Sequence, residues 1–157
     1  ITINSNIKNN NKKLYLKYNN VNEIRVLPGQ QLNYFSNESL KNFYLKKYKI
    51  TNNTDRMGAR LEGGKLEHID SFNIPSEGIS KGSIQVPGDG QPIVLLNDHP
   101  TIGGYPKIAN IITADYDNFV QKQPGTEIIF REVNIVEAEK LFNEYLIYKK
   151  KQKDLIQ

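Results

Sequence analysis

The fold is decided by one stretch in the middle of the chain, Gly82-Ser83-Ile84-Gln85-Val86-Pro87-Gly88-Asp89-Gly90-Gln91-Pro92-Ile93-Val94-Leu95-Leu96. It contains two short β-type segments, residues 83–86 and 92–96, joined by a turn whose Asp-Gly pair is a strong hairpin signal. On both sides, further glycines divide the chain into runs too short for helices: Gly58, Gly63, Gly64, Gly78, Gly103 and Gly104. Short strands with Gly/Pro turns predict a mainly β fold, a barrel or a sandwich.

The same patterns, followed outward from this hairpin, predict more strands and two short helices. The expected strands cover residues 14–18, 24–27, 44–51, 55–63, 107–113 and 126–133. Residues 9–13 are polar and predict a loop. Ser36 is expected to cap a helix over residues 37–43, and residues 114–120 are expected to form two helical turns.

The last element is predicted to be a long helix over residues 134–151. Asn134 suits the N-cap position, and Glu137 stands where a capping box places its carboxylate. An apolar face recurs at helical spacing, and we expect it to contact the core, with partner docking as the alternative: Ala138, Leu141, Phe142, Tyr145 and Leu146. Residues 149–157 are lysine-rich and are expected to be a solvated basic tail.

Length and composition exclude several classes of protein. The 157 residues suffice for one domain with its own core, and 38% hydrophobic and 24% charged residues are typical of a globular protein. No apolar run approaches the roughly 20 residues of a membrane span, so a membrane protein is not expected. Cysteine is absent and only His68 and His99 occur, so we expect neither thiol chemistry nor a protein-bound metal. A cytoplasmic location agrees with this composition.

The net charge of +4 is concentrated in the flanks of the chain. Residues 1–54 carry nine Lys and Arg against two Glu, and residues 149–157 carry four Lys against one Asp. These flanks are also rich in Asn, a usage typical of an A+T-rich genome. We therefore interpret them as solvated surface and expect no nucleic-acid partner.

Four polar clusters lie between residues 55 and 107, and the first is Asp55-Arg56-Met57-Gly58-Ala59-Arg60-Leu61-Glu62-Gly63. On a strand, alternate residues share a face, so Arg56, Arg60 and Glu62 would lie together. Two guanidinium groups beside a carboxylate can hold an anion through paired hydrogen bonds. Surface ion pairs are the alternative, and the pattern alone favours them.

The second and third clusters each contain a glutamine. Gln85 stands between β-branched neighbours, and a glutamine facing a barrel core needs hydrogen-bond partners. Its amide could bind an amide-like substrate or a neighbouring strand, and the sequence leaves both interpretations open. In the turn of residues 87–92, Gln91 is the one side chain that the turn itself does not explain.

The fourth cluster is Asn97-Asp98-His99-Pro100-Thr101-Ile102-Gly103-Gly104-Tyr105-Pro106-Lys107. Asp98 and Thr101 supply polar side chains, and the two glycines let backbone N–H groups approach an anion closely. Tyr105 adds a ring face and Lys107 a charge. A loop of this composition can cradle a phosphate or carboxylate, although it has no P-loop Lys-Ser/Thr pair.

Together the four clusters resemble the allophanate hydrolase subunit 2 family, also called the Kip-antagonist or biotin-dependent carboxyltransferase family. The motifs are Asp-Arg-Met-Gly-x-Arg-Leu-Glu-Gly, Ser-Glu-Gly-Ile with Gly-Ser-Ile-Gln-Val-Pro, Gly-Gln-Pro-Ile and Asp-x-x-Thr-x-Gly-Gly-Tyr-Pro-Lys-Ile. The resemblance covers roughly residues 21–138 and implies a cyclophilin-like β-barrel with short helices and a C-terminal helix. Members are about twice as long, so we expect residues 1–157 to be a C-terminal half. Pro100 and Ile102 replace Gln and Thr of the family's Gln-Thr-Thr-Gly-Gly.

The resemblance implies a subunit that acts with a partner, an allophanate hydrolase subunit 1 or Kip-inhibitor-type protein. In the version that resembles 5-oxoprolinase, ATP is the cofactor; it phosphorylates the lactam of 5-oxoproline, and water then opens the ring to give glutamate. We predict Gln85, Asp98 and Lys107 as catalytic residues. Substrate or phosphate binding is predicted for Arg56, Arg60, Glu62, Gln91, Thr101, Gly103, Gly104 and Tyr105.

Two alternatives follow from the same resemblance. The chain could be the carboxyltransferase half of a urea amidolyase-like enzyme, with biotin carried on another protein, or a Kip-antagonist-type regulatory module without catalysis. In each version, we expect the 98–107 loop to lie beside the strand that bears Gln85 and close to Arg56 or Arg60. We also expect the half-length chain to associate with its partner or with a second copy.

Overall fold

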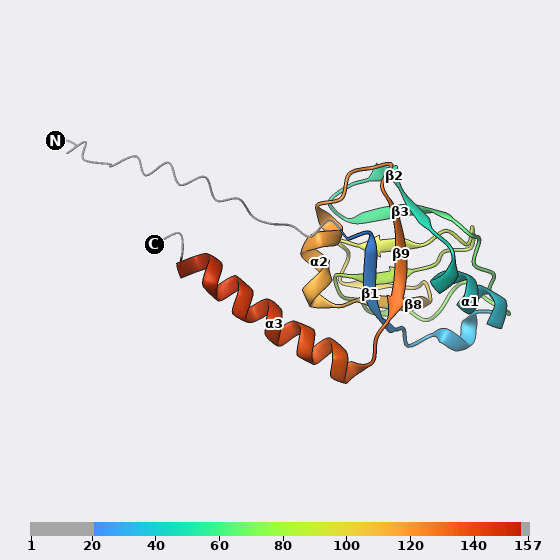
Figure 1. Ribbon diagram of the computed structural model, residues 1–157. Helices are drawn as coiled ribbons and strands as arrows, with labels where there is room; N and C mark the ends of the chain where they lie inside the picture. Colours follow the sequence, from blue (N-terminus) through green and yellow to red (C-terminus); the bar gives the residue numbers. More distant parts are fainter. Residues whose placement is uncertain (1–20, 155–157) are drawn as a thin grey trace, which may run out of the picture.

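The computed structural model describes residues 21–154, so the loop predicted at residues 9–13 and the strand predicted at residues 14–18 lie outside the described residues. Seven strands close into a barrel (Figure 1). In order around the barrel they are β1 (Glu23–Pro28), β8 (Lys107–Ile111), β5 (Ser83–Gln85), β6 (Ile93–Leu95), β3 (Gly58–Gly63), β2 (Tyr48–Thr54) and β9 (Glu127–Glu132). The predicted mainly β fold is confirmed.

The barrel closes through its first and last strands, β1 and β9. These two pair in parallel, with Glu23 opposite Ile129, whereas every other neighbouring pair in the barrel is antiparallel. A two-stranded ribbon of β4 (Glu77–Gly78) and β7 (Ile102–Gly103) forms a separate sheet. The sequence did not predict this ribbon, because strands of two residues are too short to show an alternating pattern.

Within residues 21–154, three α-helices accompany the barrel: α1 (Asn37–Leu45), α2 (Thr113–Val120) and α3 (Ile135–Asp154). A 3-10 turn, η1 (Leu32–Tyr34), precedes α1. Both predicted caps are confirmed, because the Ser36 hydroxyl accepts a hydrogen bond from the Ser39 amide at 3.1 Å and Asn134 Oδ1 accepts one from the Glu137 amide at 2.9 Å. Figure 1 shows α1 and α2 on opposite sides of the barrel, with α3 extending past α2 and away from it.

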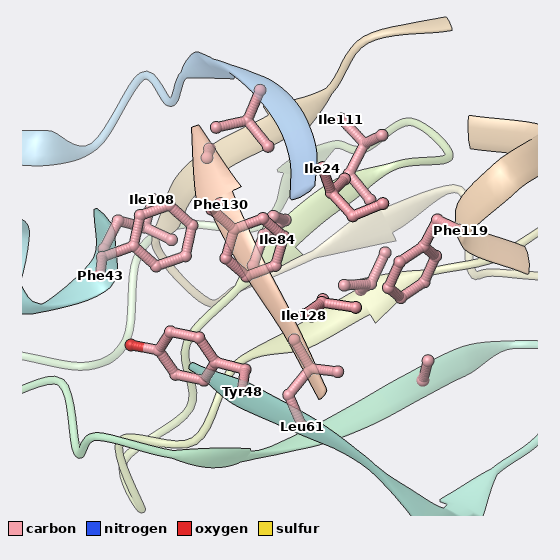
Figure 2. Packing of buried hydrophobic residues seen from close by; sticks show 14 of the residues in the cluster. Ile24, Phe43, Tyr48, Leu61, Ile84, Ile108, Ile111, Phe119, Ile128 and Phe130 are labelled. Atoms are coloured by element: carbon pink, nitrogen blue, oxygen red, sulfur yellow. The ribbon is translucent and has the colours of Figure 1, made fainter. Parts of the chain in front are cut away.

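The core fills the barrel with the inward residues of each strand, as the alternation of side chains along a strand requires. Ile24, Leu61, Ile84 and Ile128 are fully buried there. Figure 2 shows Phe43 of α1 and Phe119 of α2 entering this core from opposite ends. Burying such side chains is the main favourable term in folding.

Several predicted strand bounds shift by a few residues, and two of the shifts have simple causes. The strand predicted from residue 55 begins at Gly58, because Asp55 Oδ1 accepts hydrogen bonds from the Met57 and Gly58 amides at 2.8 and 2.9 Å and makes a turn. The strand predicted from residue 44 begins at Tyr48, because α1 continues to Leu45. Such end shifts are common where a cap or side-chain turn competes with the strand pattern.

The apolar face predicted for the last helix only partly contacts the barrel. Ala138 is buried, and Leu141 and Tyr145 are half-buried, whereas Phe142 and Leu146 are exposed. The helix also continues through the lysine-rich run, and Lys149 Nζ lies 2.7 Å from Asp117 Oδ2 on α2. No helix in residues 21–154 is long and apolar enough to cross a membrane.

Candidate functional site

A cleft of about 480 Å³ lies on the outer face of β1, β5 and β8, beside the segment that follows β4. The face is fixed by register, because Ser83 pairs with Asn110 next to the core pair Ile84 and Ala109. Side chains that alternate with core residues point out of the barrel. The lining includes Leu27, Ile79, Ser80, Ser83, Lys107 and Asn110. This volume suits a small organic ligand.

Lys107 is the charged residue of the cleft lining, and it is held by an ion pair. Its Nζ contacts Glu77 Oε1 of the ribbon, and the side chain of Lys107 is 10% exposed against 37% for Glu77. This hydrogen bond with Lys107 is the main cause that lowers the pKa of Glu77; burial opposes it, and the charge of Lys107 and a hydrogen bond from Gln31 add to the lowering. The ribbon therefore carries a carboxylate that stays ionised beside the cleft.

Gln31 joins this pair to the barrel. Its Nε2 donates to Glu77 Oε1 at 2.8 Å, and its Oε1 accepts from the Lys107 amide at 3.2 Å. The approach of this segment to β8 requires Gly29, because a Cβ there would overlap the Lys107 carbonyl oxygen. A glycine thus brings the Gln31 segment close enough to hold the ion pair.

Gln85 is buried directly opposite Lys107 in the β5–β8 pairing. Its β-branched neighbours in the sequence suggested that Gln85 faces the barrel core. Because it alternates with the core residue Ile84, its side chain instead faces the ribbon. Its Nε2 donates to the Tyr105 carbonyl at 3.3 Å, and a Cβ at Gly103 would lie 2.8 Å from that nitrogen. The amide therefore stabilises the loop before β8, which is the structural interpretation the sequence left open.

A chain of neutral polar groups forms another part of the cleft wall. The hydroxyls of Ser80 and Ser83 lie 3.2 Å apart, and the Ser83 hydroxyl donates to Asn110 Oδ1 at 3.0 Å. Asn110 Nδ2 in turn donates to the Ile111 carbonyl at 3.2 Å. Hydroxyls can rotate to donate or accept, so this wall can adapt to an amide or carboxylate ligand.

A second group of predicted residues lies around β3 and does not line the cleft. Arg56 Nε bonds Asp98 Oδ2 at 2.8 Å in a surface pair, with 87% of the arginine side chain exposed. Gln91 Oε1 accepts from the Gly63 amide at 3.0 Å, which ties the turn to the end of β3. Arg60 and Glu62 project to solvent from β3. Arg56 therefore makes a surface ion pair, but it does so from the turn before β3 and with Asp98 of the fourth cluster rather than with Glu62.

The expected proximities are present, although they do not make one shared pocket. The 98–107 loop lies beside Gln85 through Tyr105 and beside Arg56 through Asp98. Gly103 belongs to β7, the Thr101 carbonyl accepts from the Ile79 amide at 3.1 Å, and the Gly104 carbonyl accepts from the Ile74 amide at 2.8 Å. These last contacts place the predicted loop in the ribbon that borders the cleft. The role of each predicted residue in binding or catalysis stays a prediction.

Four residues of the site were not proposed from the sequence: Ser83 and Asn110, which line the cleft, and Gln31 and Glu77, which hold Lys107 beside it. Glu77 belongs to the Ser-Glu-Gly-Ile motif, so the sequence did mark this residue, but it did not show which residue Glu77 pairs with. Its partner Lys107 is distant in sequence, and only the β4–β7 ribbon brings them together. The pairing of Ser83 with Asn110 likewise follows from strand register, which a single sequence does not show.

The described residues fit a small amide-like group better than a nucleotide. The phosphates of ATP call for several cations or N–H donors, whereas Lys107 is the cation of the cleft lining and already pairs with Glu77. The charged and neutral polar groups of the cleft do not, by themselves, make a triphosphate site. Among the residues described, no group of three His, Asp or Glu is placed to hold a metal ion.

Comparison with known proteins agrees with the fold and motifs. Residues 2–132 match the family described as carboxyltransferase domain, subdomain A and B. The chain is 41% identical to the C subunit of 5-oxoprolinase from Haemophilus influenzae over 125 residues, which is 80% of this chain and 40% of that protein. It is 40% identical to the Escherichia coli C subunit of the same enzyme over 117 residues, 74% of this chain and 38% of that protein. The chain thus spans about two fifths of these curated relatives.

A solved structure of K. lactis urea amidolyase matches the fold with a TM-score of 0.74 at 27% identity. The match covers 78% of this chain and 8% of that one. The resemblance inferred from the four polar clusters is therefore confirmed at the level of the family. On the extent of the sequence match and on the barrel that accompanies it, the chain belongs to the carboxyltransferase domain, subdomain A and B family.

Proposed function

We propose that the chain supplies the C-terminal barrel of a protein of the same type as the C subunit of 5-oxoprolinase. In this proposal it works in the cytoplasm with a subunit 1-type partner, and the pair opens a small lactam at the expense of ATP. The observation that carries the proposal is the identity of 41 and 40% with two bacterial 5-oxoprolinase C subunits, against 27% with the urea amidolyase structure. Closer sequence similarity favours the lactam reaction over the urea reaction.

The cleft suits such a substrate in size and chemistry. A five-membered lactam with a carboxylate needs a cation and a pair of hydrogen-bonding groups, and the cleft presents Lys107 beside Ser83 and Asn110. In the proposal, the Lys107 ammonium, which has three N–H donors and uses one of them on Glu77, donates another to the anionic part of the substrate, and the neutral pair holds the lactam amide. Gln85 acts as a positioning residue because it holds the Tyr105 carbonyl next to Lys107.

The nucleotide is assigned to the partner in this proposal. The cleft lacks the uncompensated cations that a triphosphate requires, and Arg56 on the other side of β3 is matched by Asp98. An activity that appears only when the partner is present would agree with this division of roles.

The test is to co-express the chain with a subunit 1-type partner and to measure glutamate and ADP formed from 5-oxoproline and ATP. Lys107→Met should lower kcat/KM at least ~10-fold, which corresponds to the loss of one charge-assisted contact. The matched control is Lys49→Met, because Lys49 is an exposed lysine on β2 outside the cleft lining. Equal activity of the two variants would show that Lys107 does not contact the substrate.

The second candidate is a carboxyltransferase acting on urea with biotin carried by another protein, and the TM-score of 0.74 with urea amidolyase favours it. It predicts no glutamate from 5-oxoproline but carboxylation of urea by a carboxylated biotin carrier. If the pair binds tightly and neither reaction occurs, the chain is the regulatory module that the family resemblance also implies.

A further inference from the structure

The outer face of α3 carries apolar side chains that remain exposed in the described part of the chain. Val136, Phe142, Leu146 and Ile147 are 71, 39, 47 and 58% exposed, and Ile135 is also exposed. Residues 11 positions apart fall on the same side of an α-helix three turns on, so Ile135 aligns with Leu146 and Val136 with Ile147. These residues therefore form one continuous stripe, which we call the outer stripe.

Charges of opposite sign lie at the two ends of the outer stripe. Glu139 and Lys150 are also 11 positions apart, so both belong to it. Neither side chain has an ion-pair partner among the described residues, whereas Lys149, one position away, is held by Asp117. The rest of the helix follows this trend only in part, because its first half carries Lys140 beside Glu137 and Glu144, whereas Lys149, Lys150 and Lys151 lie in its second half.

This pattern is complementary to itself when two helices run in opposite directions. Consider two antiparallel helices whose midpoint lies at the height of residues 144 and 145 along the helix axis. Glu139 of one helix then faces Lys150 of the other, and by symmetry this contact occurs twice. The same alignment places Phe142 against Ile147 and Asn143 against Leu146. A parallel pair would instead place Glu139 against Glu139 and Lys150 against Lys150, which is unfavourable.

We propose that α3 is a self-association element through which two copies of this chain pair in antiparallel fashion along the outer stripe. The family match ends at residue 132, so this surface lies outside the part of the chain that the match shares with the family. A second copy is the occupant that the charge pattern selects, because the surface supplies both halves of each ion pair. Two helices about 30 Å long bury less than a standard interface, so the dimer is weak and concentration-dependent.

Sedimentation equilibrium of the full chain between about 1 and 100 µM tests the association. Glu139→Lys and Lys150→Glu should each weaken the dimer at least ~10-fold, and the double variant should restore the wild-type dissociation constant within ~3-fold. The matched control is Glu144→Lys, which makes the same charge change on the opposite side of the helix and should leave the constant unchanged.

The orientation is tested by disulfide formation, because the chain has no cysteine of its own. Mixing Glu139→Cys with Lys150→Cys should yield the mixed disulfide in preference to either symmetric one, whereas a parallel pair would give the symmetric products. A monomer at every concentration would overturn the proposal. A dimer whose dissociation constant is unchanged by both charge reversals would also overturn it. The same holds if the chain is a monomer and the α3 variants instead weaken its binding to the subunit 1-type partner. Because no arm measures activity, the result is independent of the proposed function.

Discussion

Removing either member of the Glu77–Lys107 pair should give clearly unequal losses of stability. Glu77→Ala leaves the Lys107 ammonium, 10% exposed, without its counter-charge. Breaking a buried pair costs about 3–5 kcal/mol; because Glu77 is 37% exposed, we expect about 2 kcal/mol here. Lys107→Met keeps most of the side-chain volume, and the remaining carboxylate still reaches water and Gln31, so we expect less than about 1 kcal/mol.

Urea unfolding measures both losses. With an m value of about 2 kcal/mol/M, Glu77→Ala should move the midpoint down by about 1 M and Lys107→Met by less than half of that. The double variant should resemble Lys107→Met, because removing the lysine removes the unpaired charge. The pKa of Glu77 is lowered in the folded state, so its contribution is present above pH 4.5 and is lost as pH falls through the folded pKa. A Lys107→Met loss equal to or greater than that of Glu77→Ala would refute this reasoning.

Three further predictions concern the scaffold. Burial lowers the pKa of His68, so the folded chain should lose stability as pH falls below 6.5, and His68→Gln should flatten that dependence in thermal melts; an unchanged profile would contradict it. Gly29→Ala should destabilise by more than about 2 kcal/mol in urea unfolding, because its Cβ would overlap the Lys107 carbonyl, and a neutral result would show that the segment moves freely. Asp115→Ala should lower the free energy of unfolding by about 2–3 kcal/mol. The buried carboxylate accepts a hydrogen bond from the Arg25 amide at 2.8 Å and two from the Arg25 guanidinium at 2.9 and 2.5 Å, and all three would be lost. A much larger loss of stability in Arg25→Ala than in Asp115→Ala would argue against this reasoning.

The strands were predictable wherever one face of the strand is buried. Ile24 and Val26 of β1 are fully buried and Arg25 between them is not, so the period of two is visible in the sequence. Helix starts were predictable because Ser36 and Asn134 act through local hydrogen bonds. The β4–β7 ribbon was not, because two-residue strands depend on contacts between distant segments.

The site was predictable only in its local part. The glycines at residues 103 and 104 and the side chains of Gln85 and Lys107 stand out in the sequence, and the structure places all of them next to the cleft or in its border. The partners that hold them were not predictable, because Gln31 and Glu77 reach Lys107 from two separate segments. In α3, the apolar pattern predicted one core-facing stripe, whereas the helix has one side on α2 and the barrel and another in solvent.

The parallel pairing of β1 with β9 has a consequence for how the chain is made. Glu23 and Arg131 lie 108 residues apart in sequence and form an ion pair across that junction. During synthesis at 5–20 residues per second, the first strand therefore waits roughly 5–20 s before its parallel neighbour exists. Both edges of nascent β1 are unpaired until β8 is made, and one edge stays unpaired from then until β9 is made. Ribosomal stalling between β8 and β9 would prolong the last part of that exposure, so slow codons at residues 112–126 would lengthen the time during which the unfinished barrel is open to aggregation.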